Sequence, residues 1–99
     1  MVKGGTVYIL TNKSNKVLYT GVTSDLFIRI TQHREHKYPH SFTAKYKVTK
    51  LVFFESYACI EEAIKREKQI KGGSRIKKVK LINKDNANWR DLYEDVQKW

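Results

Sequence analysis

Two short segments near the N-terminus are rich in β-branched and aromatic residues, and a run of turn-forming residues separates them. The segments are Thr6–Thr11 and Val17–Val22, with Asn12–Lys16 between them. β-Favouring segments joined by a short polar turn are typical of a β-hairpin. Farther along, Lys50–Glu55 is apolar at consecutive positions, which indicates a third strand that is central in its sheet or covered on both faces.

The first predicted helix places two chemically active side chains on the face that packs toward the sheet. It begins near Thr23–Asp25, which offers N-cap residues, and runs to residue 35 or 36. Arg29 and His33 are one turn apart and share a face with the apolar Leu26 and Ile30. This shared face makes an ordinary surface role less expected for Arg29.

The second predicted helix places a carboxylate in its apolar stripe. It covers Ile60–Lys71 and ends at Gly72-Gly73, a strong C-terminal signal. Apolar residues recur at helical spacing from residue 60 to residue 70, and Glu67 falls in the same stripe. An inward-facing carboxylate is costly unless it is paired. Its partner is either a bound divalent cation or a neighbouring lysine or arginine.

The rest of the chain is predicted to form a loop and two further helices. Residues 37–49 contain the only proline, and their interleaved basic and aromatic residues suit phosphate contact and base stacking. Within this loop we expect Phe42 and Tyr46 to anchor it on the core. Ser74 can cap a short helix, and the apolar spacing in Trp89–Val96 predicts a final helix that packs on the sheet.

These elements predict an α+β domain over residues 1–99, in which helices flank a three-stranded, mainly antiparallel sheet. The single cysteine, Cys59, excludes an internal disulfide, and no Cys/His cluster has zinc-site spacing. No apolar run approaches the length of a membrane span, and the N-terminus lacks the apolar segment of a signal peptide. We therefore expect a cytoplasmic protein with no membrane partner.

The charge balance favours a polyanionic partner. Lysine and arginine number 20 against 10 aspartates and glutamates, for a formal net charge of +10. Such an excess most often accompanies nucleic-acid binding. Colloidal solubility and an acidic protein partner are the alternative explanations, and charge alone does not separate them.

Five short motifs, in order along nearly the whole chain, resemble those of the GIY-YIG nuclease family. The resemblance is closest to its small single-domain bacterial branch, which is related to the N-terminal incision domain of the excision-repair nuclease and so suggests DNA repair. The motifs are Thr6-Val7-Tyr8, Tyr19-Thr20-Gly21, Gly21–Leu26 with Arg29 and His33, Glu67–Gly72, and Leu81–Asn83 followed by Asn86 and Trp89. Two positions depart from the pattern: Thr6 replaces the first glycine, and Ala87 replaces a proline.

The resemblance implies a set of catalytic residues, each with a role in phosphodiester hydrolysis. Glu67 would hold one Mg²⁺ or Mn²⁺, and the Arg29 fork would bind the phosphate. Tyr8 would activate the water if nearby positive charge lowers its pKa, whereas Tyr19 would orient water or phosphate. His33 would take the water's proton, relay it from Tyr8 or bind the phosphate; the sequence does not rank these roles.

Other residues are expected to support the site or to contact nucleic acid. The resemblance makes Gly21 a structural glycine that permits close approach of backbone and substrate. Asn86 either braces the surface of the site or caps a helix. Contacts with the phosphate backbone are expected from basic residues near the site, namely Lys45, Lys68, Lys71, Arg75, Lys77 and Lys78.

Three functions are compatible with the sequence, and the first is favoured. It is a metal-dependent endonuclease that hydrolyses DNA. The second is a non-catalytic nucleic-acid-binding module, which has no use for Glu67, and the third is a protein-interaction domain. Because 99 residues leave no room for a separate DNA-binding region, we expect cleavage to be structure-selective or nonspecific, or to be targeted by a protein partner. The oligomeric state is not readable from the sequence.

Overall fold

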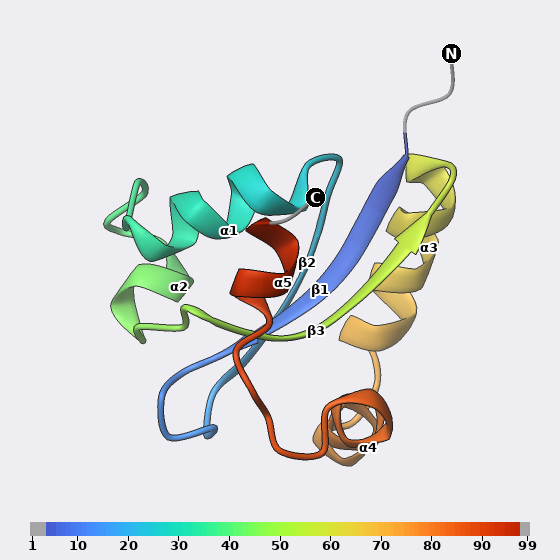
Figure 1. The fold of residues 1–99 in the computed structure, drawn as a ribbon. Coiled ribbons are helices and arrows are strands. Elements are labelled where there is room, and N and C mark those ends of the chain that lie inside the picture. Colours follow the sequence, from blue (N-terminus) through green and yellow to red (C-terminus); the bar gives the residue numbers. More distant parts are fainter. Residues whose placement is uncertain (1–3, 98–99) are drawn as a thin grey trace.

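The computed structural model describes residues 4–97, which form a three-stranded antiparallel sheet in the order β2-β1-β3 (Figure 1). Strands β1 (Gly5–Thr11) and β2 (Leu18–Thr23) form the predicted hairpin, in which Tyr8 pairs with Gly21. The predicted α+β class, with helices flanking an antiparallel sheet, is confirmed.

Strand β3 (Lys50–Tyr57) lies at an edge of the sheet, so the option of a central strand is wrong. Its apolar run has a different cause, because both faces of the strand are covered. Val52 packs in the cluster on one face of the sheet and Leu51 in the cluster on the other. An irregularity between Ile9 and Leu10 shifts the β1–β3 register at this point.

Three helices agree with the capping residues read from the sequence. Helix α1 (Leu26–Arg34) is capped by Asp25, and helix α3 (Ile60–Lys71) has Gly72 as its C-cap. Helix α4 (Arg75–Asp85) is capped by the Ser74 side chain. Local hydrogen bonds at these termini, such as Asp25 Oδ1 accepting from the Ile28 amide at 3.1 Å, explain why the sequence predicts them well.

Two predicted segments differ from the structure. The loop 37–49 contains a short helix, α2 (Phe42–Lys45), capped by the Ser41 side chain. The final helix, α5, covers only Tyr93–Gln97, because Trp89 adopts a positive φ of 53° that no α-helix accommodates. Among residues 4–97, no helix is both long enough and apolar enough to cross a membrane.

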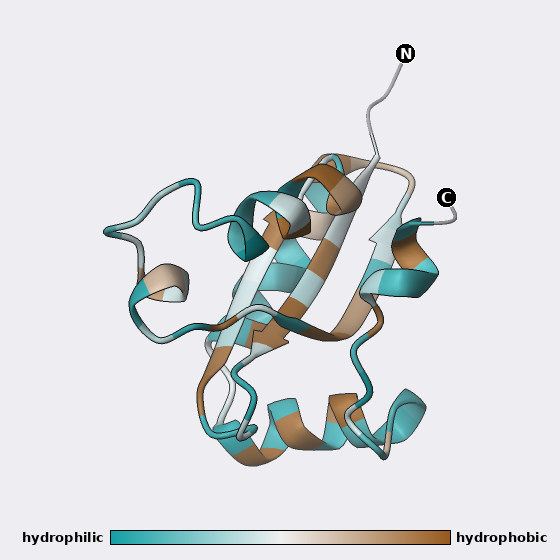
Figure 2. Cartoon of the chain, turned by 60° about the vertical axis from the view of Figure 1, so that its left-hand side comes forward, coloured by the Kyte–Doolittle hydropathy of each residue, from teal (hydrophilic) through white to brown (hydrophobic). Residues whose placement is uncertain are grey.

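The sheet separates two layers of helices. Helices α3 and α4 cover one face, where Val7 and Ile9 of β1 point, and helices α1 and α5 cover the other, where Tyr8 and Leu10 point (Figure 1). Figure 2 shows hydrophobic bands along the strands between these layers, whereas the long connection after α1 is hydrophilic. The alternation along β1 therefore sends Tyr8 into the layer that contains Arg29 and His33.

Candidate active site

Tyr8 is the buried centre of the site and is only 1% exposed. Its ring lies directly over Gly21 on the neighbouring strand. A Cβ atom at Gly21 would lie 2.5 Å from both Cζ and the hydroxyl oxygen of Tyr8. The absence of a side chain at Gly21 therefore makes room for the tyrosine ring, and the approach of substrate to this glycine stays a prediction.

His33 connects Tyr8 to the α2 segment through buried hydrogen bonds. Its Nε2 atom lies 3.1 Å from the Tyr8 hydroxyl, and its Nδ1 atom lies 2.9 Å from Thr43 Oγ1. Thr43 Oγ1 in turn lies 3.2 Å from Ser41 Oγ. His33 is 7% exposed and Thr43 is 3% exposed, so both ring nitrogens have protein partners in a largely dry environment.

Arg29 lies beside the same hydroxyl, one turn before His33. Its guanidinium is close enough to the Tyr8 hydroxyl to favour the phenolate and so to act toward a lower pKa of Tyr8. Its Nη1 atom donates to Gln32 Oε1 at 3.3 Å, and its Cζ atom lies 5.7 Å from the centre of the Tyr38 ring. Arg29 remains partly exposed, so its cation is accessible to a phosphate that enters the site.

Burial keeps both members of the Tyr8–His33 pair neutral at pH 7. Burial raises the pKa of Tyr8 to about 12, although the nearby Arg29 guanidinium acts in the opposite direction. Burial and the nearby Arg29 charge lower the pKa of His33 to about 4. Positive charge near Tyr8 therefore does not bring its pKa below the usual value, because desolvation of the phenolate is the larger effect.

An open pocket of about 460 Å³ lies beside His33 and Arg29, and Tyr8 is buried behind its lining. The Tyr19 ring borders it, with its centre 6.4 Å from that of Tyr8 and 5.7 Å from that of His33. Phe42 stacks on Tyr19 at 6.1 Å, yet Phe42 is 47% exposed and Tyr46 is 44% exposed. The prediction that these two aromatics anchor on the core is therefore wrong; they extend a partly exposed aromatic surface beside the pocket.

Glu67 approaches the site from helix α3, and its side chain is only 12% exposed. Its charge raises the pKa of Tyr8. Its carboxylate also pairs with Lys71 Nζ at 3.6 Å, so the ion pair considered from the sequence is present. Residues 4–97 contain no group of three or more His, Cys, Asp or Glu side chains able to hold a metal. A single carboxylate fits Mg²⁺, which commonly keeps several of its waters.

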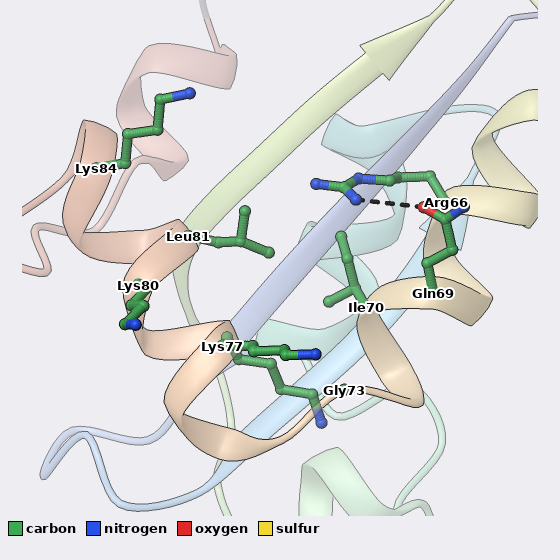
Figure 3. A pocket seen from close by; sticks show the side chains of 9 residues that line it. Arg66, Gln69, Ile70, Gly73, Lys77, Lys80, Leu81 and Lys84 are labelled. Atoms are coloured by element: carbon green, nitrogen blue, oxygen red, sulfur yellow. Dashed lines mark hydrogen bonds between the residues drawn. The ribbon is translucent and has the colours of Figure 1, made fainter.

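Two of the predicted nucleic-acid contacts, Lys77 and Lys78, line a separate groove of about 360 Å³ between α3 and α4. Ile70 and Leu81 point toward each other across it, and basic side chains surround them (Figure 3). Arg66, which also borders the groove, donates to Glu55 on β3 at 2.9 Å. Glu67 is not among the residues that line this groove.

The other predicted contacts lie on three parts of the surface. Lys45 is on α2, beside the aromatic surface, with Nζ 5.4 Å from the centre of the Tyr46 ring. Lys68 and Lys71 are exposed on α3. Arg75 donates to the Asn15 carbonyl at 3.1 Å and so links α4 to the hairpin turn. Contact of these residues with nucleic acid stays a prediction.

Asn86 is buried at the end of α4, and its side chain makes several hydrogen bonds to backbone groups. Its Nδ2 donates to the Val52 carbonyl at 3.1 Å and to the Arg90 carbonyl at 2.8 Å, and its Oδ1 accepts from the Arg90 amide at 3.0 Å. It is also the C-cap of α4. It thus joins the helix end to β3. The Thr6 hydroxyl pairs with Ser56 Oγ at 3.1 Å, also on β3.

Sequence reasoning missed Thr43 and Ser41 as members of the site. Both lie in the segment that was predicted to be an irregular loop, and a serine or threonine there is typical of any turn. The capping position of Ser41 before Phe42–Lys45 is a local signal that a short helix starts here. No local pattern indicates that Thr43 contacts a histidine ten positions earlier in the chain.

Comparison with known proteins agrees with this geometry. Residues 4–80 match the family model described as the GIY-YIG catalytic domain. A UPF0213 protein from Syntrophus aciditrophicus is 39% identical over 79 residues, which cover 80% of this chain and 90% of that protein. A UPF0213 protein from Staphylococcus haemolyticus is 40% identical over 80 residues, 77% and 90% of the respective chains.

A solved structure supports the same assignment. The solution NMR structure of a UPF0213 protein from Bacillus halodurans has a TM-score of 0.56 and 30% identity, and the match covers 90% of this chain and 93% of that one. The family match, these relatives and the arrangement of Tyr8, His33 and Arg29 lead to one assignment. This chain belongs to the GIY-YIG nuclease family, in its small UPF0213 group.

Proposed function

We propose that this chain is a divalent-metal-dependent endonuclease that hydrolyses DNA phosphodiester bonds by structure-selective or nonspecific cleavage. The observation that carries the proposal is the buried hydrogen bond between the Tyr8 hydroxyl and His33 Nε2, with Arg29 beside it. A tyrosine in contact with a neutral histidine can pass on a proton without forming an isolated phenolate. The partly exposed Arg29 supplies a phosphate-binding cation at the same place.

Water activation is proposed to proceed through the Tyr8–His33 pair in one concerted step. The attacking water gives its proton to the Tyr8 oxygen while the Tyr8 hydroxyl proton moves to His33 Nε2. The new oxygen–phosphorus bond forms, the bond from phosphorus to the leaving sugar oxygen breaks, and that oxygen takes a proton from solvent. Prior ionisation of Tyr8 is disfavoured because burial raises its pKa to about 12. A concerted step avoids that cost.

Arg29 and Tyr19 are proposed to position the phosphate. Arg29 would donate to the non-bridging oxygens, where negative charge builds up in the transition state. Tyr19 borders the pocket with its ring centre 5.7 Å from that of His33, so it would contact a phosphate that enters there. Glu67 would hold one Mg²⁺ or Mn²⁺, which when bound supplies Lewis-acid stabilisation of the phosphate and leaving oxygen.

Cleavage without sequence preference is supported by the chemistry of the surface. Tyr38 and Phe42 line the pocket and are exposed, and Lys37 Nζ lies 5.9 Å from the centre of the Tyr38 ring. Such groups recognise phosphates and base faces rather than base edges. Such contacts supply affinity that depends on salt and carry little sequence information. A randomised-target screen that returns a sharp consensus site would contradict this part of the proposal.

Cleavage of labelled single-stranded, duplex, nicked and branched DNA tests the proposal. The wild type, Glu67→Gln and Arg29→Lys are compared with Mg²⁺, Mn²⁺ or EDTA. Glu62→Gln is the matched control, because Glu62 is exposed on the same helix. We expect metal-dependent cuts that fall by about 100-fold or more in the first two variants and persist in the control. Binding without cleavage in every metal would favour the non-catalytic module instead.

A further inference from the structure

We infer that Thr43 is a positioning residue that holds His33 in the tautomer whose Nε2 lone pair accepts the Tyr8 hydroxyl proton. This inference rests on the proposed function, since it explains how the Tyr8–His33 pair is kept ready for proton transfer. It also makes the short helix α2 part of the catalytic machinery, through the support that it gives to His33.

The Tyr8 side of the pair favours this tautomer. Tyr8 is 1% exposed and the nearby Arg29 can only donate hydrogen bonds, so the Tyr8 hydroxyl proton needs another acceptor. His33 Nε2 lies 3.1 Å away and can accept it only when Nε2 carries no proton. In the opposite tautomer, His33 Nε2 would donate to the Tyr8 oxygen, and the buried Tyr8 proton would face no acceptor among these groups.

The other ring nitrogen explains the role of Thr43. When Nε2 is unprotonated, the neutral ring carries its proton on Nδ1, which donates to Thr43 Oγ1 at 2.9 Å. Thr43 can then donate to Ser41 Oγ at 3.2 Å, and the Ser41 oxygen also accepts from the Ala44 amide at 3.3 Å. The chain of donors runs in one direction from Tyr8 to the N-cap of α2.

The same hydrogen-bond partners can also serve the protonated form that the proposed reaction creates. When His33 Nε2 receives the Tyr8 proton, both ring nitrogens become donors. Nδ1 keeps its bond to Thr43, and Nε2 now donates to the Tyr8 oxygen, so neither the ring nor the loop has to move. A partner that is already oriented lowers the reorganisation needed during proton transfer. Thr43 is 3% exposed, which excludes most competing water from Nδ1.

Nitrogen-15 NMR of the imidazole tests the inference without any cleavage assay. Long-range correlation spectra at pH 7 distinguish Nδ1–H from Nε2–H in the wild type, Thr43→Val, Thr43→Ser and Thr49→Val. Thr49 is the control, because it lies in the connection between α2 and β3 and is only partly buried. We expect the Nδ1–H tautomer in the wild type, Thr43→Ser and the control, and a mixture or the Nε2–H form in Thr43→Val.

The cleavage rate supplies the second readout. Thr43→Val should lower kcat by about 10-fold or more with little change in KM, and Thr43→Ser should restore most of the rate. An Nε2–H tautomer in the wild type overturns the inference even if every variant fails to fold. An unchanged tautomer in Thr43→Val also overturns it. If no protein cleaves DNA but the tautomers behave as expected, the inference about Thr43 stands and the proposed nuclease activity fails.

Discussion

Acidification through the titration range of His33 should destabilise this protein by an amount that the structure predicts. The ring is held between Tyr8 and Thr43 and lies beside the Arg29 cation, so burial and that charge lower its folded pKa to about 4 from 6.5. Between these two values the unfolded chain binds a proton that the folded chain does not. Stability from this residue is therefore complete above about pH 6.5 and is lost as the pH falls to about 4.

The size of the effect follows from the difference between the two pKa values. They differ by about 2.5, and each unit corresponds to about 1.4 kcal/mol of free energy. The full difference gives an upper value of about 3 kcal/mol. Local relaxation around the charged ring will reduce this figure, so a loss of about 2 to 3 kcal/mol is expected between pH 7 and pH 4.

Urea unfolding followed by circular dichroism, at constant ionic strength and steps of pH, measures this loss. His33→Gln removes the titrating ring, and His36→Gln is the control because His36 is exposed. Carboxylates titrate in all three proteins, so the relevant quantity is the stability difference between the wild type and His33→Gln. That difference should shrink by 2 to 3 kcal/mol on acidification. Parallel curves for the two proteins would refute the buried, neutral state of His33.

Two further substitutions test the packing around the site. Gly21→Ala should displace the Tyr8 ring, because the new Cβ would lie 2.5 Å from it, and should cost about 1 to 3 kcal/mol in urea unfolding together with most of the cleavage rate. Gly72→Ala meets no atom closer than 3.3 Å and should be milder; equal losses would argue against the contact. Asn86→Ala breaks three hydrogen bonds and should lower unfolding free energy by about 2 to 3 kcal/mol, whereas exposed Asn88→Ala should change it little.

Several features follow directly from local sequence chemistry. The hairpin was predicted from β-favouring segments joined by turn residues, and the starts of α1 and α4 from capping side chains, and the structure places them where expected. Such features depend on hydrogen bonds between residues a few positions apart, which any unfolded segment can sample. The last helix was predicted to start too early in the chain, because apolar spacing alone does not reveal the positive φ of Trp89.

The sequence predicted which residues form the candidate site, but it did not predict the pKa of Tyr8 within that site. The sequence order of the motifs indicated Tyr8, Arg29, His33 and Glu67 together, and the structure brings Tyr8, Arg29 and His33 into contact, with Glu67 close enough to act on Tyr8. The expectation that positive charge would lower the Tyr8 pKa does not hold, because burial has the larger and opposite effect. Burial is a property of the packed chain, so residue types and spacing alone cannot predict it.

The amino-acid order was enough to determine the family, the elements and the residues from which a site is built. The direction of the hydrogen bonds in that site came from the tertiary structure, because His33 meets Tyr8 and Thr43 across separations of 25 and 10 residues. The need for Gly21 likewise depends on a ring from the adjacent strand. Periodicity and capping act within a few residues, whereas desolvation and these contacts exist only after the sheet and its two helical layers have packed.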